Sequence, residues 1–378
     1  MRELQPRTPR RHLDLIGTVP RPSGGVAQHV WRLAMRMAPF GCRVLDIHPA
    51  ESKYPMPNVD HACSPWLGLA KAAWLYGKLL SSAARVAHFH FSSTRAFGLG
   101  RCWIPRNRRS QVRILTLHHG NLHDLHRRLN NCTRRIAAAS IRRFDRIIAL
   151  SDLQHEFYTN MLQVPVDRLV RAGSFLSLPP SALDRCTTLG AVIPHGNRQD
   201  VSLVASGYVV PYYRHEESIR LVDRLRERCD ARLTLCLYGP REDHEYLKLI
   251  QTLAAARPHV SLRFDLDLPE FLPILAEADV YLRPNTVDSY GIAVGDAISL
   301  GVPVVASDVC DRYPGTTLFP VGDYDAFEHA VEQVVGNLAR YRQAIAGIPA
   351  TDSFNAYLHA YDLPCLQTPA LFDYKLVA

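Results

Sequence analysis

The sequence has few of the features that mark exported, membrane-spanning or zinc-finger proteins. Its nine cysteines are scattered, their number is odd, and none belongs to a C-x-x-C pair. This argues against a disulfide framework or a zinc module and fits a reducing compartment. The basic N-terminus has no apolar core of signal-peptide length, and Lys71 and Lys78 interrupt the most apolar stretch. We therefore expect a cytoplasmic protein without a membrane-spanning helix.

The sequence also has no low-complexity tract and no G-x-G-x-x-G dinucleotide fingerprint. Its composition is that of a globular protein, with 378 residues, 47% hydrophobic and 21% charged, enough for two domains. The formal charge of +8, carried mainly by arginine, suits an acidic ligand, a membrane surface or nucleic acid, or reflects codon usage alone. Because no known nucleic-acid-binding module is present, we expect no nucleic-acid partner.

Short apolar runs alternate with helical patterns along most of the chain. In the first half the pattern predicts strands at residues 13–19, 43–49, 84–92, 112–120 and 145–152. In the second half it predicts strands at residues 201–210, 231–239, 260–266, 278–284 and 302–308, followed by a single helix over 326–347. Such alternation is typical of an α/β protein whose parallel sheets are covered by helices on both faces.

The alternation weakens between the two halves. Residues 176–200 carry prolines and polar residues without a period, which indicates a linker. We predict two doubly wound domains, residues 1–175 and 201–349, with the C-terminal tail 350–378 packing back on the first. Ligands of such sheets bind at the carboxyl ends of the strands, so a cleft between two facing sheets is the expected binding place.

Two glycines follow the first predicted strand. Gly24 and Gly25 in SGGVAQHV would let the backbone approach a ligand closely, and the free N–H groups of the next helix would suit an anion. A plain tight turn is the alternative.

Histidines gather around the predicted strands at 84–92 and 112–120. His88 and His90 alternate, so both side chains face the same side of the sheet, as cleft wall or as hydrogen-bonded core. The segment LHHGNLHDLH, residues 117–126, holds four more. Its spacing matches no zinc signature, so we expect no metal site there. A histidine at a strand end that points into a cleft is the favoured interpretation.

The segment DSYGIAVGD, residues 288–296, places two acids eight residues apart with glycines between them. If a helix begins near Gly291, its first N–H groups are unpaired and carry a partial positive charge. Acids at both ends would then accept hydrogen bonds from hydroxyl groups while the middle receives a phosphate. The alternative is an ordinary N-cap by Asp288 or Ser289 with Asp296 solvated, which leaves the Gly295–Asp296 pair unexplained.

These pieces together resemble one family. S-G-G-V near the N-terminus, H-x-H on a strand, T-L-H at 116–118, I-I-A-L-S-D at 147–152 and D-S-Y-G-I-x(4)-D-A-I-S-L-G-V-P-V-V-A-S follow in the order of retaining GT-B glycosyltransferases. The branch is the glycosyltransferase group 1 family, which includes bacterial polysaccharide and lipopolysaccharide enzymes, and the resemblance covers residues 13–345. It implies two Rossmann-like domains that face each other across a cleft. The first would bind the acceptor and the second a nucleotide-sugar donor.

The resemblance implies a role for each part of the 288–296 segment. The family's E-x7-E motif falls on Asp288, which would contact the hydroxyls of the donor sugar, and Asp296, which would contact those of the ribose. Backbone amides of the turn would meet the sugar and the diphosphate. The residues of this turn are Ser289, Tyr290, Gly291 and Ile292.

The first domain would complete the site. By resemblance, Gly24 and Gly25 approach the donor phosphates, and His118 lies near the reaction centre, with His119 as the alternative one residue on. Such enzymes need no catalytic metal and no cofactor other than the nucleotide-sugar substrate.

The sequence departs from the family at the donor site. Both acids of the motif are aspartates, each shorter than glutamate by one carbon–carbon bond, about 1.5 Å. Tyr208 and Tyr213 stand where the family places an arginine and a lysine against the diphosphate. Either the neighbouring Arg214 substitutes, or the donor differs, or the protein is not a competent transferase.

We therefore expect a retaining, metal-independent glycosyltransferase that moves a sugar from a nucleotide-sugar to a glycan or lipid-linked acceptor, in bacterial surface polysaccharide assembly. The alternatives are a non-catalytic GT-B protein that binds a nucleotide-sugar or a partner, and a sugar-nucleotide 2-epimerase on the same fold.

Basic residues concentrate in the first half, beside an amphipathic segment at residues 68–86 that contains Trp74 and Tyr76. Together they could hold the first domain on the anionic inner face of the plasma membrane; a solvated basic face is the alternative. The basic residues are Arg101, Arg106, Arg108, Arg109, Arg113, Arg127, Arg128, Arg134, Arg135, Arg142 and Arg143.

Overall fold

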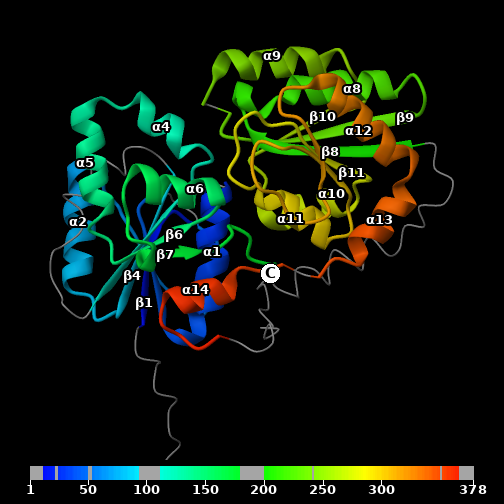
Figure 1. The fold of residues 1–378 in the computed structure, drawn as a ribbon. Coiled ribbons are helices and arrows are strands. Elements are labelled where there is room, and N and C mark those ends of the chain that lie inside the picture. Colours follow the sequence, from blue (N-terminus) through cyan, green and yellow to red (C-terminus); the bar gives the residue numbers. More distant parts are fainter. Residues whose placement is uncertain are drawn as a thin grey trace, which may run out of the picture. The chain divides into compact units, whose positions relative to one another are not determined.

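The computed structural model describes residues 12–21, 24–49, 53–92, 111–178, 200–240, 242–349 and 351–365. These residues form two compact units (Figure 1). One holds the described residues up to Leu176 together with those from Ser353 onward, and the other holds those between Ser177 and Asp352. Most of the predicted linker, residues 179–199, lies outside the described residues, as do Arg101, Arg106, Arg108 and Arg109.

The described part of the first unit contains a seven-stranded sheet in the order β3-β2-β1-β4-β5-β6-β7, in which every pairing is parallel. The central strands are buried and mainly apolar, as expected for a sheet covered on both faces. The sequence predicted five of them; the two edge strands β3 and β7, four and three residues long, were missed. The strands are β1 (Leu13–Gly17), β2 (Cys42–Asp46), β3 (Asp60–Cys63), β4 (Val86–Phe91), β5 (Val112–Leu117), β6 (Arg146–Ala149) and β7 (Leu169–Arg171).

Side chains at the helix starts explain where several helices of this unit begin. Asn121, Asn130 and Ser151 each accept a hydrogen bond from the backbone N–H three residues on, which satisfies a free donor of the first turn. The helices are α1 (Gly25–Met37), α2 (Gly68–Leu80), α4 (Leu122–Arg128), α5 (Asn131–Ile141), α6 (Asp152–Glu156) and α14 (Phe354–Ala360).

The chain returns to the first unit at its C-terminal end. After α14, the hydroxyl group of Tyr361 lies 2.7 Å from Nδ1 of His88 on β4, and Arg146 on β6 forms an ion pair of 2.8 Å with Asp362. The predicted tail 350–378 is described only for residues 351–365.

The described part of the second unit contains a six-stranded parallel sheet in the order β10-β9-β8-β11-β12-β13. The strands are β8 (Asp200–Tyr208), β9 (Asp230–Tyr238), β10 (Val260–Phe264), β11 (Val280–Arg283), β12 (Val304–Ser307) and β13 (Thr317–Phe319). The helices are α8 (His215–Leu225), α9 (His244–Ala255), α10 (Leu268–Ala276), α11 (Ile292–Ser299), α12 (Tyr324–Gly336) and α13 (Leu338–Ala346).

The prediction of a single helix over residues 326–347 is wrong. Asn337 leaves the helical conformation, with φ −139° and ψ 36°, directly after Gly336, and divides the segment into α12 and α13. Glycine and asparagine both have low helix propensity, so two together are a reasonable place for the break.

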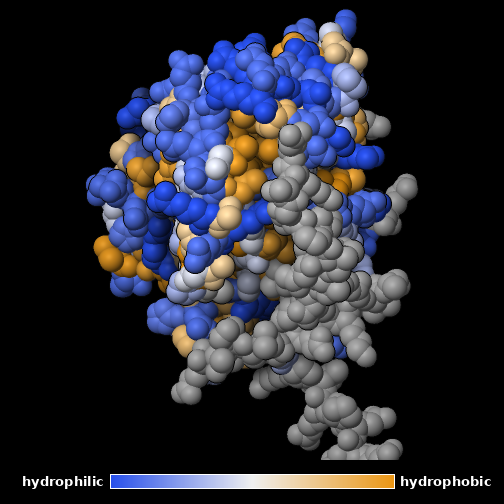
Figure 2. Space-filling model, turned by 90° about the vertical axis from the view of Figure 1, so that its right-hand side faces the viewer, coloured by the Kyte–Doolittle hydropathy of each residue, from blue (hydrophilic) through white to orange (hydrophobic). Residues whose placement is uncertain are grey.

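Each sheet has a point where the strand order reverses, between β1 and β4 in the first unit and between β8 and β11 in the second. Ligands of doubly wound sheets bind at the carboxyl ends of the strands at such points. The surface in Figure 2 is largely hydrophilic, with separate apolar patches. Among the described helices, none is long and apolar enough to cross a membrane.

Candidate functional site

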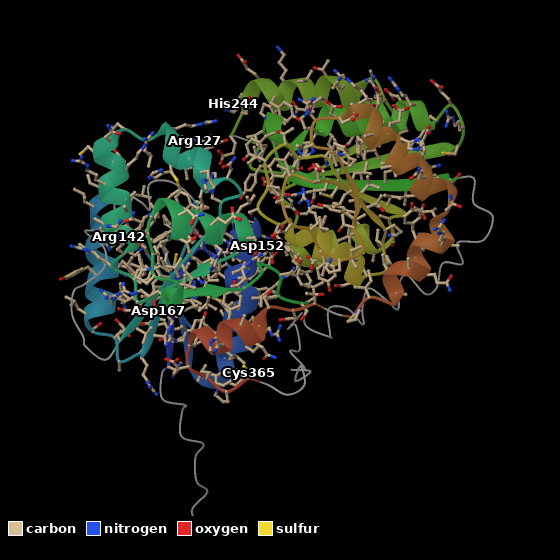
Figure 3. The ribbon with its side chains drawn as sticks, in the orientation of Figure 1. Arg127, Arg142, Asp152, Asp167, His244 and Cys365 are labelled. Carbon is tan, nitrogen blue, oxygen red and sulfur yellow. The ribbon has the colours of Figure 1, made fainter. Side chains whose placement is uncertain are left out.

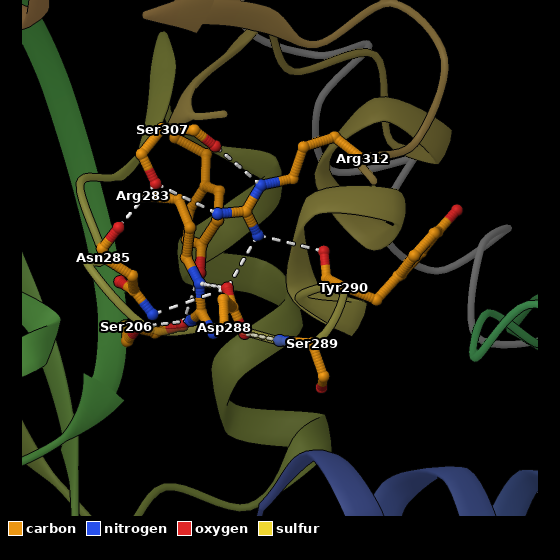
Figure 4. Close-up of polar contacts among 9 residues, drawn as sticks. Ser206, Arg283, Asn285, Asp288, Ser289, Tyr290, Ser307 and Arg312 are labelled. Carbon is orange, nitrogen blue, oxygen red and sulfur yellow. Dashed lines mark hydrogen bonds and ion pairs between the residues drawn. The ribbon is translucent and has the colours of Figure 1, made fainter. Parts of the chain in front are cut away.

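A buried cluster of charges lies where the strand order of the second unit reverses (Figure 4). Arg283 ends β11, and its Nε lies 2.8 Å from Oδ2 of Asp288. Arg312, beyond β12, places Nη1 2.6 Å from the same oxygen. All three side chains are at most 8% exposed. Two guanidinium groups against one carboxylate leave one positive charge in excess.

The two arginines decide the charge state of Asp288. Burial alone would raise the pKa of this carboxyl group, but the guanidinium groups of Arg283 and Arg312 outweigh it and hold the pKa well below its ordinary value. The Arg283 guanidinium also donates to the backbone oxygen of Ser206 at 2.9 Å. Asp288 is therefore ionised, and Arg283, which it holds, joins the ends of β8 and β11.

Arg312 fixes the conformation of the turn between β11 and α11. It donates to the backbone oxygens of Ser307 and Tyr290, each at 3.0 Å. Gly291 has φ +78°, and a Cβ there would lie 3.0 Å from Nη1 of Arg312 and 3.2 Å from Oδ2 of Asp288. Glycine is thus required at this position by both backbone conformation and space.

Helix α11 begins at Ile292 with Gly291 as its N-cap, as the sequence predicted. No side chain of the described chain caps it, so the alternative of Asp288 or Ser289 as an ordinary N-cap is wrong. Its first N–H groups carry the positive end of the helix dipole. Asp296, in the second turn, is 2% exposed, so the alternative of a solvated Asp296 is wrong too.

An aromatic side chain lies at a position where the resemblance implied a cation. The Tyr213 ring lies over Arg283, with 5.0 Å between the ring centroid and Cζ. Gly207 makes room for it, because a Cβ there would lie 1.9 Å from Cδ1 of Tyr213. Burial raises the pKa of the Tyr213 phenol, which stays neutral. The positive charge next to Tyr213 therefore comes from Arg283 at the end of β11.

Arg214, the expected substitute cation, has partners of its own. It adopts a left-handed conformation with φ 55° before α8, and its guanidinium pairs with Glu217 and, at 3.4 Å, with Glu216. Both glutamates are 8% exposed. Because two carboxylates face one guanidinium group, the net charge of Arg214, Glu216 and Glu217 together is negative.

In the first unit, the reversal point holds the glycine loop. Gly24 is the N-cap of α1 in an extended conformation, and no described side chain caps the helix. A Cβ on Gly25 would meet nothing within 4 Å. The described structure therefore does not itself demand glycine at residue 25.

His118 follows β5, and its backbone N–H donates to Phe91 at 2.7 Å, which extends the β4–β5 pairing. Its ring is buried, and Nε2 lies 3.1 Å from Nδ1 of His90. Burial lowers the pKa of His118 well below its ordinary value, so the ring is neutral. His119, the alternative, accepts a hydrogen bond from the backbone of Asn121 through Nδ1.

The predicted residues divide between the units. Gly24, Gly25 and His118 belong to the first; Arg214, Asp296 and the turn from Asp288 to Ile292 belong to the second. Sequence reasoning missed Arg283 and Arg312. The available signal was Arg283 at the end of the apolar run VYLR, because a buried guanidinium needs a partner such as Asp288. Nothing local in the sequence marked Arg312.

Two family models match the chain. The model described as Glycosyltransferase Family 4 matches residues 23–171, and the one described as Glycosyl transferases group 1 matches residues 200–337. Among curated proteins, none matches the sequence.

Several solved structures have a similar fold. WaaG, a glycosyltransferase involved in lipopolysaccharide biosynthesis, is 15% identical with a TM-score of 0.66, over 93% of this chain and 99% of that one. HepE from Anabaena, solved with UDP and glucose, is 14% identical with a TM-score of 0.64, over 93% and 98%. The catalytic domain of starch synthase IV from Arabidopsis thaliana, bound to ADP and acarbose, is 12% identical with a TM-score of 0.67, over 93% and 99%.

At these sequence identities the solved structures show the fold alone. The family models identify the two halves of the sequence as glycosyltransferase domains. The chain belongs to the GT-B glycosyltransferases, with a family 4 domain in its first half and a group 1 domain in its second.

Proposed function

We propose that this protein transfers a sugar, with retention, from a nucleotide-sugar donor to a glycan or lipid-linked acceptor, in bacterial surface polysaccharide assembly. The observation that carries the proposal is the turn from Asp288 to Ile292. It combines uncapped helix amides, a left-handed glycine and two arginines at the reversal point of the sheet. Such a place suits the diphosphate of a nucleotide-sugar.

The charges at this turn would stabilise the diphosphate as the leaving group. As the bond between the sugar and the diphosphate breaks, negative charge grows on the diphosphate oxygen. Fixed donors and cations at that place stabilise the charge without reorganising. We assign this role to the amides of Tyr290, Gly291 and Ile292 and to the excess charge of Arg283 and Arg312. This arrangement uses no metal ion at the diphosphate.

We assign Asp288 mainly to positioning. One of its oxygens accepts from both arginines and the other from the backbone of Ser289 at 2.9 Å. A carboxylate has further lone pairs, and these would accept from hydroxyls of the donor sugar. Asp296 would accept from the ribose, and this contact requires a small opening beside α11.

The first unit would supply the acceptor side. Gly24 and Gly25 would bring backbone close to the donor phosphates, and His118 would line the reaction centre as a neutral ring. The acceptor hydroxyl attacks the sugar on the face that the diphosphate leaves, and its proton passes to the leaving diphosphate oxygen. The protein contributes position and field rather than a proton-transfer residue.

We also propose that the first unit meets an anionic membrane. Leu69, Tyr76 and Leu80 of α2 are 86%, 41% and 41% exposed and share one helical face, and Leu67 before them is 73% exposed. Trp74 instead packs against the core. Basic residues of α4 and after α5, including Arg127 and Arg142, would add charge attraction (Figure 3).

A screen of UDP-, GDP- and ADP-sugars with the full-length protein tests the proposal. We expect nucleotide release from at least one donor, faster with acceptor and without added divalent metal. Binding without any release would contradict transfer and favour the non-catalytic alternative, which the pairing of Arg214 with two glutamates also favours. Recovery of the donor as its C2 epimer would favour the epimerase.

A further inference from the structure

Three histidine rings from separate elements meet inside the first unit. His29 lies on α1, His90 on β4 and His118 directly after β5. Their ring centroids are 4.9 to 5.4 Å apart in all three pairs, and all three side chains are buried. One nitrogen from each ring can be chosen so that all three lie within 4.8 Å of one another.

The hydrogen bond of His29 leaves its other ring nitrogen with a free lone pair. Its Nδ1 lies 2.7 Å from the backbone oxygen of Ser174 and must donate, because a carbonyl oxygen only accepts. Its Nε2 is therefore unprotonated, and among the described residues it has no hydrogen-bond partner. A histidine that ligates a metal commonly donates its other ring N–H to a backbone carbonyl in this way.

His90 is also incompletely satisfied. Nδ1 of His90 lies 3.1 Å from Nε2 of His118, while Nε2 of His90 finds no partner in the part of the chain that the structure describes. A buried polar atom left unpaired destabilises the fold unless a ligand engages it. His88, stacked 3.9 Å from His90, differs, because Tyr361 and Thr116 engage both of its nitrogens at 2.7 Å.

We propose that His29, His90 and His118 bind one divalent transition-metal ion, with zinc as the best fit. A tetrahedral site with Zn–N bonds of about 2.0–2.1 Å places its ligand nitrogens about 3.3 Å apart and its imidazole centroids roughly 5 Å apart. The 3.1 Å between nitrogens of His90 and His118 and the 4.9–5.4 Å between ring centroids agree with these values, and the three chosen nitrogens all lie within 4.8 Å of one another. Three protein ligands leave the fourth position to water or another oxygen ligand.

The chemistry of the ligands suits this ion. Imidazole nitrogens bind zinc in the neutral form. Burial lowers the pKa of His29 to about 4 and the pKa values of His90 and His118 well below 6.5, so all three rings are neutral at pH 7. The site was not visible in the sequence, because its members are 61 and 28 residues apart and only the fold joins them.

Metal content tests the site without reference to sugar transfer. Full-length protein produced with zinc supplementation and then desalted should retain about one equivalent per chain. His29→Gln and His90→Gln should weaken binding by more than the roughly 10- to 100-fold that loss of an outer partner costs. The matched control is His359→Ala, an exposed histidine on α14 of the same unit, which should retain the metal.

A cobalt spectrum of the wild-type protein keeps the test independent of whether the variants fold. Protein produced with cobalt should show the intense visible absorption of a tetrahedral site. Absence of metal from the zinc- and cobalt-grown wild type, or equal retention by folded His29→Gln and His90→Gln, would overturn the proposal. Neither readout depends on the proposed transferase activity, so the two proposals can fail separately.

Discussion

At the scale of single residues, the buried charges of the second unit matter most. Asp288 lies at the proposed donor site, but its hydrogen bonds are those of a structural residue. Both of its oxygens already accept from Arg283, Arg312 or Ser289. Removing one partner of a buried ion pair leaves an uncompensated charge, which costs far more than the pair contributes.

Asp288→Asn should therefore lower the free energy of unfolding by about 3–5 kcal/mol, because two buried guanidinium groups lose their shared carboxylate. Chemical denaturation followed by circular dichroism measures this. Asp325→Asn, an exposed aspartate in the first turn of α12, is the control and should change stability by less than about 1 kcal/mol. An unchanged stability of Asp288→Asn would show that Asp288 is only a ligand contact.

His215 should make the second unit sensitive to acid. Burial lowers the pKa of this ring to about 4, and its Nε2 donates to the backbone of Tyr208 at 3.1 Å. The unfolded chain takes up the proton near pH 6.5, so stability is complete above that pH and falls as pH drops toward 4. The loss is on the order of 3 kcal/mol.

His215→Gln keeps an N–H donor but cannot titrate. Its free energy of unfolding should fall less between pH 7 and pH 4 than that of the wild type. Equal acid sensitivity of the two proteins would exclude His215 as a contributor.

At the scale of elements, the N-termini of two helices are the proposed binding places for the donor phosphates. Helices α1 and α11 both have a glycine at the N-cap and no side-chain cap, each at the reversal point of its sheet. In α11 the glycine is fixed by Arg312 and Asp288, whereas at Gly25 of α1 the described surroundings are open. The proposed donor phosphates would explain the second case.

Gly25→Ala and Gly77→Ala form a matched pair, because both glycines lie in helices of the first unit and neither Cβ would meet an atom within 4 Å. Alanine should leave stability unchanged or raise it by up to about 1 kcal/mol in both. Donor affinity, measured by calorimetry, should fall by about tenfold or more in Gly25→Ala only. Equal affinity of the two variants would place the donor away from Gly25.

At the scale of the whole molecule, each of the two units contains its own doubly wound parallel sheet. Alternating short apolar runs sufficed to predict both sheets, because buried parallel strands are continuous apolar segments. The glycine turn before α11 was also predictable, since Gly295 and Asp296 within the helix both lower helix stability and an ordinary N-cap does not explain them. The edge strands β3, β7 and β13 were missed because they are short and partly exposed, so none of them forms a run of buried apolar residues.

What could not be predicted depends on contacts across the fold. Arg312 lies 24 residues from Asp288, and His29 lies 61 residues from His90. The sequence reasoning sought cations within one loop and metal ligands within one segment. Tyr213 in place of a cation suggested that a positive charge had been lost from this site. In the structure, however, its ring lies over Arg283, which belongs to strand β11.

The proposed membrane attachment would involve the first unit as a whole. The protein should co-sediment with vesicles that contain anionic lipid and less with neutral ones. A Leu67→Asp, Leu69→Asp double variant should lose most of this binding, because it places charges on the exposed apolar face. Leu249→Asp, at a leucine of the second unit that is 46% exposed, should bind as the wild type does. Equal binding by all three proteins would exclude α2 as the contact.

The most direct test of the central claim is hydrogen–deuterium exchange of the full-length protein with UDP, ADP and GDP. If the start of α11 receives the donor diphosphate, a nucleotide that binds should slow exchange in the peptide spanning residues 289–299, with little change in α12 or α13. Saturation by a nucleotide without protection of that peptide, or binding of none of the three, would contradict the account.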